Sequence, residues 1–378
     1  MKLIIERAAL LRILSHANGV VEKRNTIPIL ANVKLVAENN TLSLTATDLE
    51  IAIVEQAPAD VLQAGQTTAP AQMLFDIARN LPDGSQVELT FNADDGRLTV
   101  RSSRSTFALS CLPTEDFPVM SEGDLPHAFR IGREDLGRLF DKTRFAISTE
   151  ETRYYLNGVY LHPIAADDPT GSGTPVMRAV ATDGHRLARA EIALPEGAAE
   201  APGVIVPRKT VQEVLKLLDE SGGAVDISLS DSKIRFAIGE MVLTSKLIDG
   251  TFPDYQRVIP SGNERRLEVD CETFSRAVNR VSIISSEKSR AVKLAMASDT
   301  LVLSANSPDA GSATDEVPVT YQGGEPMEIG FNSRYLLDIT QQIEGETARF
   351  ELADAASPTI IRDAGDESAL YVLMPMRV

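Results

Sequence analysis

A chain of 378 residues is longer than a single hydrophobic core usually serves, so we expect two or three domains. Its 43% hydrophobic and 24% charged residues are typical of a soluble globular protein, and no apolar run of about 18 residues predicts a transmembrane helix. The formal net charge of −17, averaged over the whole chain, argues against a nucleic-acid-binding protein.

The sequence offers no motif for a cofactor, a metal or a disulfide framework. It has four histidines but no CxxC, HExxH, P-loop or GxGxxG pattern, so we expect no cofactor and no metal site. The two cysteines, Cys111 and Cys271, are 160 positions apart in no motif, which is typical of the reduced cytoplasm. The N-terminus is not a signal peptide because Glu6 and Arg7 interrupt its apolar stretch, and we expect no membrane partner.

Six segments along the chain place apolar or small residues at i, i+3, i+4 and i+7, the spacing of one face of an amphipathic helix. The six sets are Leu10, Ile13, Leu14, Ala17; Leu74, Ile77, Ala78, Leu81; Leu136, Leu139, Phe140, Thr143; Val211, Val214, Leu215, Leu218; Phe274, Ala277, Val278, Val281; and Leu336, Ile339, Thr340, Ile343. The odd-numbered sets recur after 126 and 138 residues, and the even-numbered sets after 137 and 125. This register predicts three repeats of two helices each.

A strand with alternating apolar residues follows the second helix of every repeat. The three strands contain Val87, Leu89, Phe91; Val225, Ile227, Leu229; and Ala348, Phe350, Leu352. The two helical sets begin 75 residues apart in the middle repeat, against 64 and 62 in the others, and the Pro/Gly/Asp-rich loop 163–175 accounts for the difference. Each repeat is therefore predicted to be α+β, with two helices packed on a β-sheet.

Two similar segments, DFPVMSEGDLP and TFPDYQRVIPSGN, end the first two repeats. Their Phe-Pro pairs, 117–118 and 252–253, are 135 residues apart. Proline favours an extended backbone before it, and the following Gly, Ser and Asn residues are turn formers, so both segments are predicted linkers. The expected domains are 1–125, 126–260 and 261–378.

The helical segments differ in charge from the rest of the chain. The windows 6–18, 71–81, 133–146, 208–220, 272–284 and 333–343 hold 13 basic and 10 acidic residues, whereas the remainder holds 24 basic and 44 acidic residues. One interpretation is that these are ordinary solvated helix faces. The other is that all six helices share a surface that meets a polyanion, while the acidic exterior repels it elsewhere.

The stretch ATDGHRLA, residues 181–188, combines an acid, a glycine, a base and a guanidinium. Asp183-Gly184 between two apolar runs is a strong hairpin-turn signal because glycine tolerates a positive φ. A catalytic interpretation needs His185 as a general base with an orienting partner and a substrate pocket, and no second histidine or nucleophile motif suggests them. A β-rich scaffold that binds proteins but not DNA is a further alternative.

Five segments, ATDGHRLA, FPDYQRVIP, SSEKSRAVKL, EIGFN and the terminal YVLMPMRV, together resemble the bacterial DNA polymerase III beta subunits, the sliding clamps. The resemblance extends over the whole chain in the same order. It implies a head-to-tail homodimer that closes a ring around duplex DNA without reading its sequence, with the predicted helices on the inner wall. It further implies a processivity factor without catalytic activity that tethers the replicative polymerase, is opened by a separate clamp loader, and binds repair proteins.

The resemblance also implies site residues for DNA and for the dimer. The DNA-contacting residues would be Arg24, Arg153, Tyr154, Tyr155, Arg208, Lys209 and Lys216. The dimer contact would join Phe107 and Leu109, on an edge strand, to Ile283 and Ile284, at the end of a helix. Four residues depart from the basic pattern expected near DNA and argue against strong static binding: Glu150, Glu151, Gln72 and Met73. Without the resemblance, the tyrosines fit a strand start and the four dimer residues fit an ordinary core.

Finally, the resemblance implies a partner-peptide pocket between the second and third repeats. The pocket residues would be Leu156, Thr182, Gly184, His185, Arg186, Leu187, Pro253, Arg257, Val258, Val372, Met374, Pro375, Met376 and Arg377. Its lining would be apolar, with His185, Arg186, Arg257 and Arg377 at the rim. Apolar clefts that contain methionine adapt to several peptides, which suits a tether shared by several partners.

Overall fold

The computed structural model describes residues 1–22, 26–121, 123–168, 173–220, 222–285 and 290–377. Arg24, the middle of the loop 163–175 and most of the SSEKSR segment lie outside these ranges. The chain forms two compact units, each of which takes part of the middle repeat. Unit 1 comprises Met1–Glu134, Glu196–Pro202 and Lys209–Leu247, and unit 2 comprises Asp135–Pro195, Gly203–Arg208 and Ile248–Val378.

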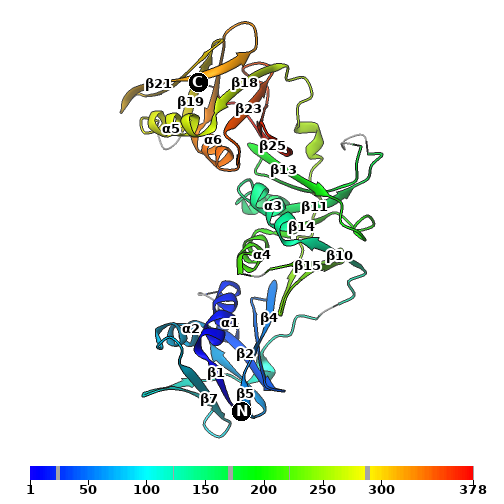
Figure 1. Cartoon of the computed structure of the whole chain (residues 1–378), viewed down its shortest axis with the longest axis vertical. Coiled ribbons are helices and arrows are strands. Elements are labelled where there is room, and N and C mark those ends of the chain that lie inside the picture. Colours follow the sequence, from blue (N-terminus) through cyan, green and yellow to red (C-terminus); the bar gives the residue numbers. More distant parts are fainter. Residues whose placement is uncertain (23–25, 122, 169–172, 221, 286–289, 378) are drawn as a thin grey trace. The chain divides into compact units, whose positions relative to one another are not determined.

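All six predicted helices are present (Figure 1). They are α1 (Arg7–Val20), α2 (Ala71–Asn80), α3 (Arg133–Arg144), α4 (Arg208–Glu220), α5 (Cys271–Ser282) and α6 (Ser333–Thr340). The predicted apolar stripes are buried, apart from Ile77, Leu215 and Ile343, which are half-buried. Within the described residues, no helix combines the length and apolar character needed to cross a membrane.

Each helix starts directly after a strand and is followed by three more, so this pattern occurs six times. The leading strands are β1 (Lys2–Glu6), β6 (Gly65–Pro70), β10 (His127–Gly132), β14 (Val204–Pro207), β18 (Arg265–Asp270) and β22 (Met327–Asn332). The following strands are β2 (Asn32–Glu38), β3 (Thr41–Thr47), β4 (Ile51–Pro58); β7 (Gln86–Asn92), β8 (Arg97–Ser102), β9 (Ser105–Ser110); β11 (Gly158–Ile164), β12 (Val176–Thr182), β13 (Arg186–Ala193); β15 (Ala224–Leu229), β16 (Lys233–Ile238), β17 (Met241–Lys246); β19 (Ala291–Met296), β20 (Thr300–Ser307), β21 (Gly311–Gln322); and β23 (Thr347–Leu352), β24 (Thr359–Asp363), β25 (Asp366–Leu373). A short strand, β5 (Asp60–Gln63), is additional.

Unit 1 contains two sheets. The five-stranded sheet has the order β5-β1-β7-β8-β9, and the eight-stranded sheet has the order β10-β15-β16-β17-β4-β3-β2-β6. The first and second repeats are joined where β17 pairs antiparallel with β4, with Thr244 opposite Ala52. Helices α1 and α2 pack against each other, and α1 covers β3 and β4.

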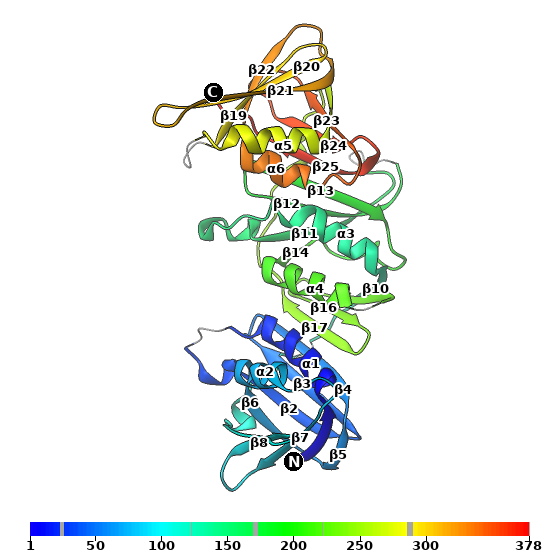
Figure 2. The same cartoon turned by 60° about the vertical axis from the view of Figure 1, so that its left-hand side comes forward.

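Unit 2 contains one twelve-stranded sheet of order β14-β11-β12-β13-β25-β24-β23-β18-β21-β20-β19-β22. The second and third repeats are joined where β13 pairs antiparallel with β25, with Leu187 opposite Val372. Helices α5 and α6 lie side by side (Figure 2). Because both joints carry a sheet from one repeat into the next, the compact units do not coincide with the three repeats.

Candidate functional site

The stretch ATDGHRLA forms the hairpin between β12 and β13, which confirms the turn prediction. Thr182 lies opposite Leu187, and the residues between Thr182 and Arg186 make the turn. Gly184 has a φ of +87°, in the left-handed region that favours glycine. Asp183 Oδ1 accepts the backbone N–H groups of His185 at 2.9 Å and of Arg186 at 3.1 Å. The aspartate therefore stabilises the turn.

Arg186, which is expected at the rim of the pocket, is buried in an ion-pair network. Its Nε donates to Asp183 Oδ2 at 3.1 Å, its Nη1 to Asp338 Oδ2 at 2.5 Å and its Nη2 to the carbonyl of Phe145 at 2.7 Å. The guanidinium also lies over the rings of Phe145 and Tyr335. With a side chain only 8% exposed, Arg186 links the turn to α6 and to the end of α3. Arg186 is thus held by internal partners, and its place at the rim of a peptide pocket stays a prediction.

The C-terminal residues are fixed beside the same turn. The N–H of Met374 donates to the carbonyl of His185 at 3.0 Å, and the N–H of Met376 donates to the carbonyl of Gly330 at 2.8 Å. Met374 remains 41% exposed, Pro375 and Met376 are half-buried, and Arg377 is exposed. Two apolar side chains are thus presented on a tethered backbone.

A buried apolar cluster lies next to the turn. Leu156, Leu187 and Val372 are each buried in one cluster that also contains Val180, Ile205, Phe252, Tyr255, Ile360 and Leu370. Thr182 is half-buried, and its hydroxyl donates to the carbonyl of Arg186. Pro253, Arg257 and Val258 are exposed in the segment that holds Tyr255, and His185 and Gly184 are exposed in the turn. The residues expected to line the pocket therefore divide into a buried group and an exposed group.

A polar network that the sequence analysis missed lies against this cluster. The hydroxyl of Tyr255 accepts from Arg178 Nη1 at 2.8 Å and lies 3.0 Å from His162 Nε2, while Arg178 Nε donates to Glu191 at 2.6 Å. Burial and the nearby Arg178 charge lower the pKa of His162 to about 4. The only sequence signal was Arg178 itself, because an arginine within an apolar strand requires a buried acceptor.

The residues expected to meet DNA are largely engaged within the chain. Arg153 makes a two-pronged ion pair with Glu150, at 2.8 and 2.6 Å, and this hydrogen-bonded pair lowers the pKa of the Glu150 carboxyl. Tyr154 is 53% exposed and packs edge-on against the half-buried Tyr155. A Cβ added at Gly184 would lie 2.5 Å from Arg153 Nη1, so this loop adjoins the hairpin turn.

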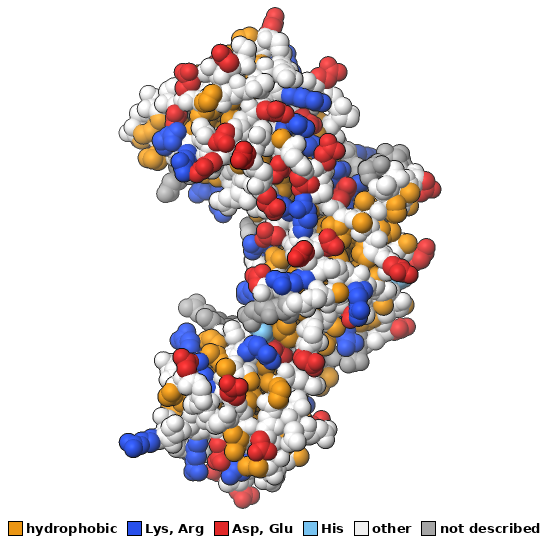
Figure 3. Space-filling view, viewed as in Figure 1, with side chains coloured by type: hydrophobic (Ala, Val, Ile, Leu, Met, Phe, Trp, Pro, Cys, Tyr) orange, Lys and Arg blue, Asp and Glu red, His pale blue; other side chains and the backbone are white. Residues whose placement is uncertain are grey.

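The lysines and arginine of α4 also have internal partners. Arg208 Nη2 donates to the carbonyls of Ile147 and Ser148. Lys209 Nζ donates to the carbonyl of Val20 and to Asp48, and the 61%-exposed Lys216 pairs with Glu213 at 2.7 Å. Four residues depart from the basic pattern expected near DNA. Glu150 pairs with Arg153, Gln72 donates a hydrogen bond to Asp76, and Glu151 and Met73 are exposed. Acidic and basic side chains intermingle on the visible face of each unit (Figure 3).

The four residues expected at a dimer contact lie on an edge strand and directly after a helix, and they differ in exposure. Phe107 and Leu109 are on β9, the edge strand of its sheet, where Phe107 is 36% exposed and Leu109 is buried. Ile283 and Ile284 follow the last residue of α5, and Ile283 is 79% exposed.

Three family models match successive parts of the chain. They describe the N-terminal, central and C-terminal domains of the DNA polymerase III beta subunit and match residues 1–121, 130–254 and 256–377. The repeated two-helix α+β architecture is therefore that of three clamp domains.

The whole chain is also similar to individual members. The beta sliding clamp of Caulobacter vibrioides is 53% identical and that of Escherichia coli K12 is 38% identical, each over 100% of both chains. Among solved structures, a Caulobacter crescentus beta sliding clamp with bound polyethylene glycol is 53% identical and has a TM-score of 0.96. The match covers 100% of this chain and 99% of that chain. A Bartonella birtlesii sliding clamp bound to griselimycin is 49% identical, with a TM-score of 0.95 and complete coverage of both chains. This chain belongs to the DNA polymerase III beta subunit family, the beta sliding clamps of DNA replication.

Proposed function

We propose that two copies of this chain close head to tail into a ring that encircles duplex DNA and tethers the replicative polymerase to it. The observation that supports this most directly is the way in which sheets continue from one repeat to the next. The chain contains six elements that each consist of a strand, a helix and three further strands. Both joints between repeats pair the last strand of one such element with the last strand of another: β4 pairs with β17, and β13 pairs with β25. Two last strands, β9 and β21, are left without such a partner in the described residues.

A second copy can supply that partner. Among the residues that the structure describes, strand β9 pairs on one side only, with β8, and residues 311–318 of β21 pair on one side only, with β20. A joint between β9 of one copy and β21 of the other would cover both edges, and exposed sheet edges require pairing or covering. The exposed Phe107 and Ile283 and the half-buried Ile284 would be covered at this contact, and Leu109 is already buried beneath β9. Two identical contacts then close the ring.

The DNA contact that we propose is weak and independent of sequence. The helical windows are slightly basic in a chain of charge −17, and contacts to phosphates carry no sequence information. Arg153, Arg208, Lys209 and Lys216 already have internal partners, so each phosphate contact competes with an existing bond. A ring that is held by its closure can slide because its static contacts are weak.

The partner site that we propose is the pocket bordered by the hairpin turn, the C-terminal residues and the segment around Pro253. Its occupants would be short peptide segments of the polymerase, the clamp loader and repair proteins. The buried apolar floor and the exposed Met374 and Val258 favour apolar peptide side chains. The domains would be 1–125, 126–260 and 261–378, so the pocket would lie between the second and third.

We further propose that the chain has no catalytic activity and acts in the cytoplasm, where bacterial DNA is replicated. The enzyme alternative rests on His185 and Asp183. The Asp183 carboxylate already binds two backbone N–H groups and Arg186, which leaves it poorly suited to orient the histidine as a base. His185 stacks near Tyr335, with ring centroids 6.3 Å apart.

A processivity assay tests the function. A replicative polymerase and an ATP-driven loader extend a primer on circular single-stranded DNA, with excess competitor DNA added so that each polymerase binds once. We expect long products only when this protein is present. Products of equal length with and without it would contradict the tethering function. If this protein bound the polymerase but was never retained on DNA, the result would favour the scaffold that binds proteins but not DNA.

A further inference from the structure

A hollow of ≈ 420 Å³ lies on the eight-stranded sheet of unit 1, where β4 and β17 join the first two repeats. We call it the β4–β17 hollow. Its floor consists of short side chains, and its border is the segment Phe117–Met120, which leads from the first repeat to the second. None of the sites described above includes it.

The strand registers arrange the floor as two rows that run across the strands. In one row, Thr45 lies opposite Val54, which lies opposite Val242. In the other row, Thr47 lies opposite Ala52, which lies opposite Thr244. Two long cationic side chains stand at the opposite ends of these rows: Lys34, opposite Thr45, and Arg235, opposite Thr244.

The border segment is held at both ends without closing the hollow. The Phe117 ring is buried against Ile29 and Leu30. At the other end, Lys233 Nζ donates to the carbonyl and the hydroxyl of Ser121, both at 2.8 Å. Between these anchors Val119 is 81% exposed. The segment therefore forms a wall, and the floor stays open to a ligand.

The hollow occupies the same register positions in unit 1 as part of the proposed peptide pocket in unit 2. In each unit such a row crosses from one strand of a hairpin to the other, and then across the joint to a strand of the next repeat. The row of Thr47, Ala52 and Thr244 is therefore equivalent to the row of Thr182, Leu187 and Val372. The larger apolar side chains are replaced by Ala and Thr. Lys34 and Arg235 stand where unit 2 has Tyr160 and Ile360. Unit 1 therefore carries a shallower and more cationic version of that surface.

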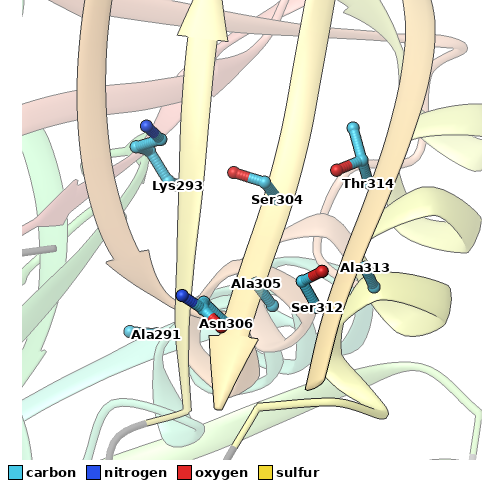
Figure 4. A pocket seen from close by; sticks show the side chains of 8 residues that line it. All are labelled: Ala291, Lys293, Ser304, Ala305, Asn306, Ser312, Ala313 and Thr314. Atoms are coloured by element: carbon cyan, nitrogen blue, oxygen red, sulfur yellow. The ribbon is translucent and has the colours of Figure 1, made fainter. Parts of the chain in front are cut away.

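The two cations are available for a ligand. Within the described residues, neither Lys34 nor Arg235 has a carboxylate within 4.0 Å, whereas Arg186 and Arg153 do. A second hollow, on the face of β19–β21, differs in this respect (Figure 4). Its lysine, Lys293, pairs with Glu328 at 3.1 Å. In a chain of charge −17, unpaired cations at both ends of one hollow favour an acidic ligand.

We propose that the β4–β17 hollow binds an acidic peptide segment of a partner protein. Lys34 and Arg235 are on β2 and β16, four strand spacings or roughly 19 Å apart, which matches about six residues of extended peptide. Carboxylates at the two ends of such a segment reach both cations, and apolar side chains between them cover Val54 and Ala52. A small dicarboxylate is too short to bridge the two ends.

The test uses the full-length protein with methyl-labelled methionines and NMR spectroscopy. The probe is the blocked peptide EAVAVAE, whose glutamates lie on one face of an extended strand, and the matched control is QAVAVAQ. Met120 reports on the hollow, and Met374 and Met376 report on the proposed pocket in unit 2. We expect EAVAVAE to shift the Met120 signal saturably and to leave the other two unchanged, and QAVAVAQ to bind about tenfold more weakly.

Two variants assign the binding to the cations. Arg235→Gln and Lys34→Gln should each weaken EAVAVAE binding several-fold, and a second variant is available if one fails to fold. Lys246→Gln is the control. It removes an exposed lysine of β17 that pairs with Glu50, and it should change the affinity for EAVAVAE little. An unchanged Met120 signal at millimolar peptide, equal binding of QAVAVAQ, or unaltered affinity in both variants would overturn the proposal. Equally tight binding of succinate would replace the peptide with a small anion.

Discussion

Arg186 illustrates how a residue in a chemically suggestive motif can have a structural role. All three of its guanidinium nitrogens donate hydrogen bonds, to Asp183, Asp338 and the carbonyl of Phe145. The sequence predicted the hairpin turn, because Asp-Gly between strands has a local physical cause. It could not predict the pairing with Asp338, which is 152 residues away and carries no local signal.

Replacing Arg186 with methionine should lower the free energy of unfolding by about 3 kcal/mol, because it removes a buried guanidinium that binds Asp183, Asp338 and the Phe145 carbonyl. Urea unfolding followed by circular dichroism measures this. Arg257→Ala is the matched control: its side chain is 85% exposed and pairs with the exposed Asp254, so the change should stay within about 0.5 kcal/mol. Equal effects of the two substitutions would show that the Arg186 network contributes little.

His162 should make stability depend on pH. Its folded pKa of about 4 is below the value of 6.5 for an unperturbed histidine, so between pH 6.5 and 4 the unfolded chain binds a proton that the folded chain does not. The free energy of unfolding therefore falls as the pH falls through this window, by roughly 3 kcal/mol from this group.

The measurement is urea unfolding at a series of pH values for the protein and for His162→Phe. Phenylalanine cannot be protonated and can keep the stacking on Tyr160, whose ring centroid lies 4.5 Å from that of His162. Carboxylates contribute equally to both proteins, so the difference in slope isolates His162. Parallel pH profiles would mean that His162 titrates normally in the folded state.

At the scale of elements, the helices were predictable and the joints between sheets were not. Each helix presents four apolar or small positions on one face, so its periodicity is visible within eight residues. Strands β13 and β25 pair although Leu187 and Val372 are 185 positions apart, and nothing local in either strand specifies the other. The same holds for the anchoring of the C-terminal residues: their apolar character was visible, but their hydrogen bonds to His185 and Gly330 were not.

Removing residues 374–378 should weaken binding of a polymerase-tail peptide by about tenfold or more. The deletion removes Met374 and Met376, and full burial of one methionine contributes roughly 1.5–3 kcal/mol. Isothermal titration calorimetry measures the affinity, and His185→Ala, which leaves the tail in place, should change it only modestly. Because strand β25 ends at Leu373, the truncated chain keeps its sheet. Unchanged affinity in the truncated protein would remove the tail from the site.

At the scale of the whole molecule, net charge alone was misleading. A total of −17 argues against nucleic acid, whereas the distribution of charge over the helical windows allows it. Closure of the ring, and not electrostatic affinity, is what the family and the open edges of strands β9 and β21 in the described residues support. The central claim is therefore topological, and it is independent of how strongly any one lysine or arginine binds phosphate.

Retention on circular DNA tests this claim most directly. Protein loaded onto nicked circular plasmid should stay bound through a wash at about 1 M salt, where the Debye length of roughly 3 Å suppresses electrostatic binding, and should be lost once the plasmid is linearised. Phe107→Asp, a change at a partly exposed position of the edge strand β9, should prevent retention on the circle while the chain stays folded. Equal loss of the unmodified protein from circular and linear DNA would contradict the closed ring.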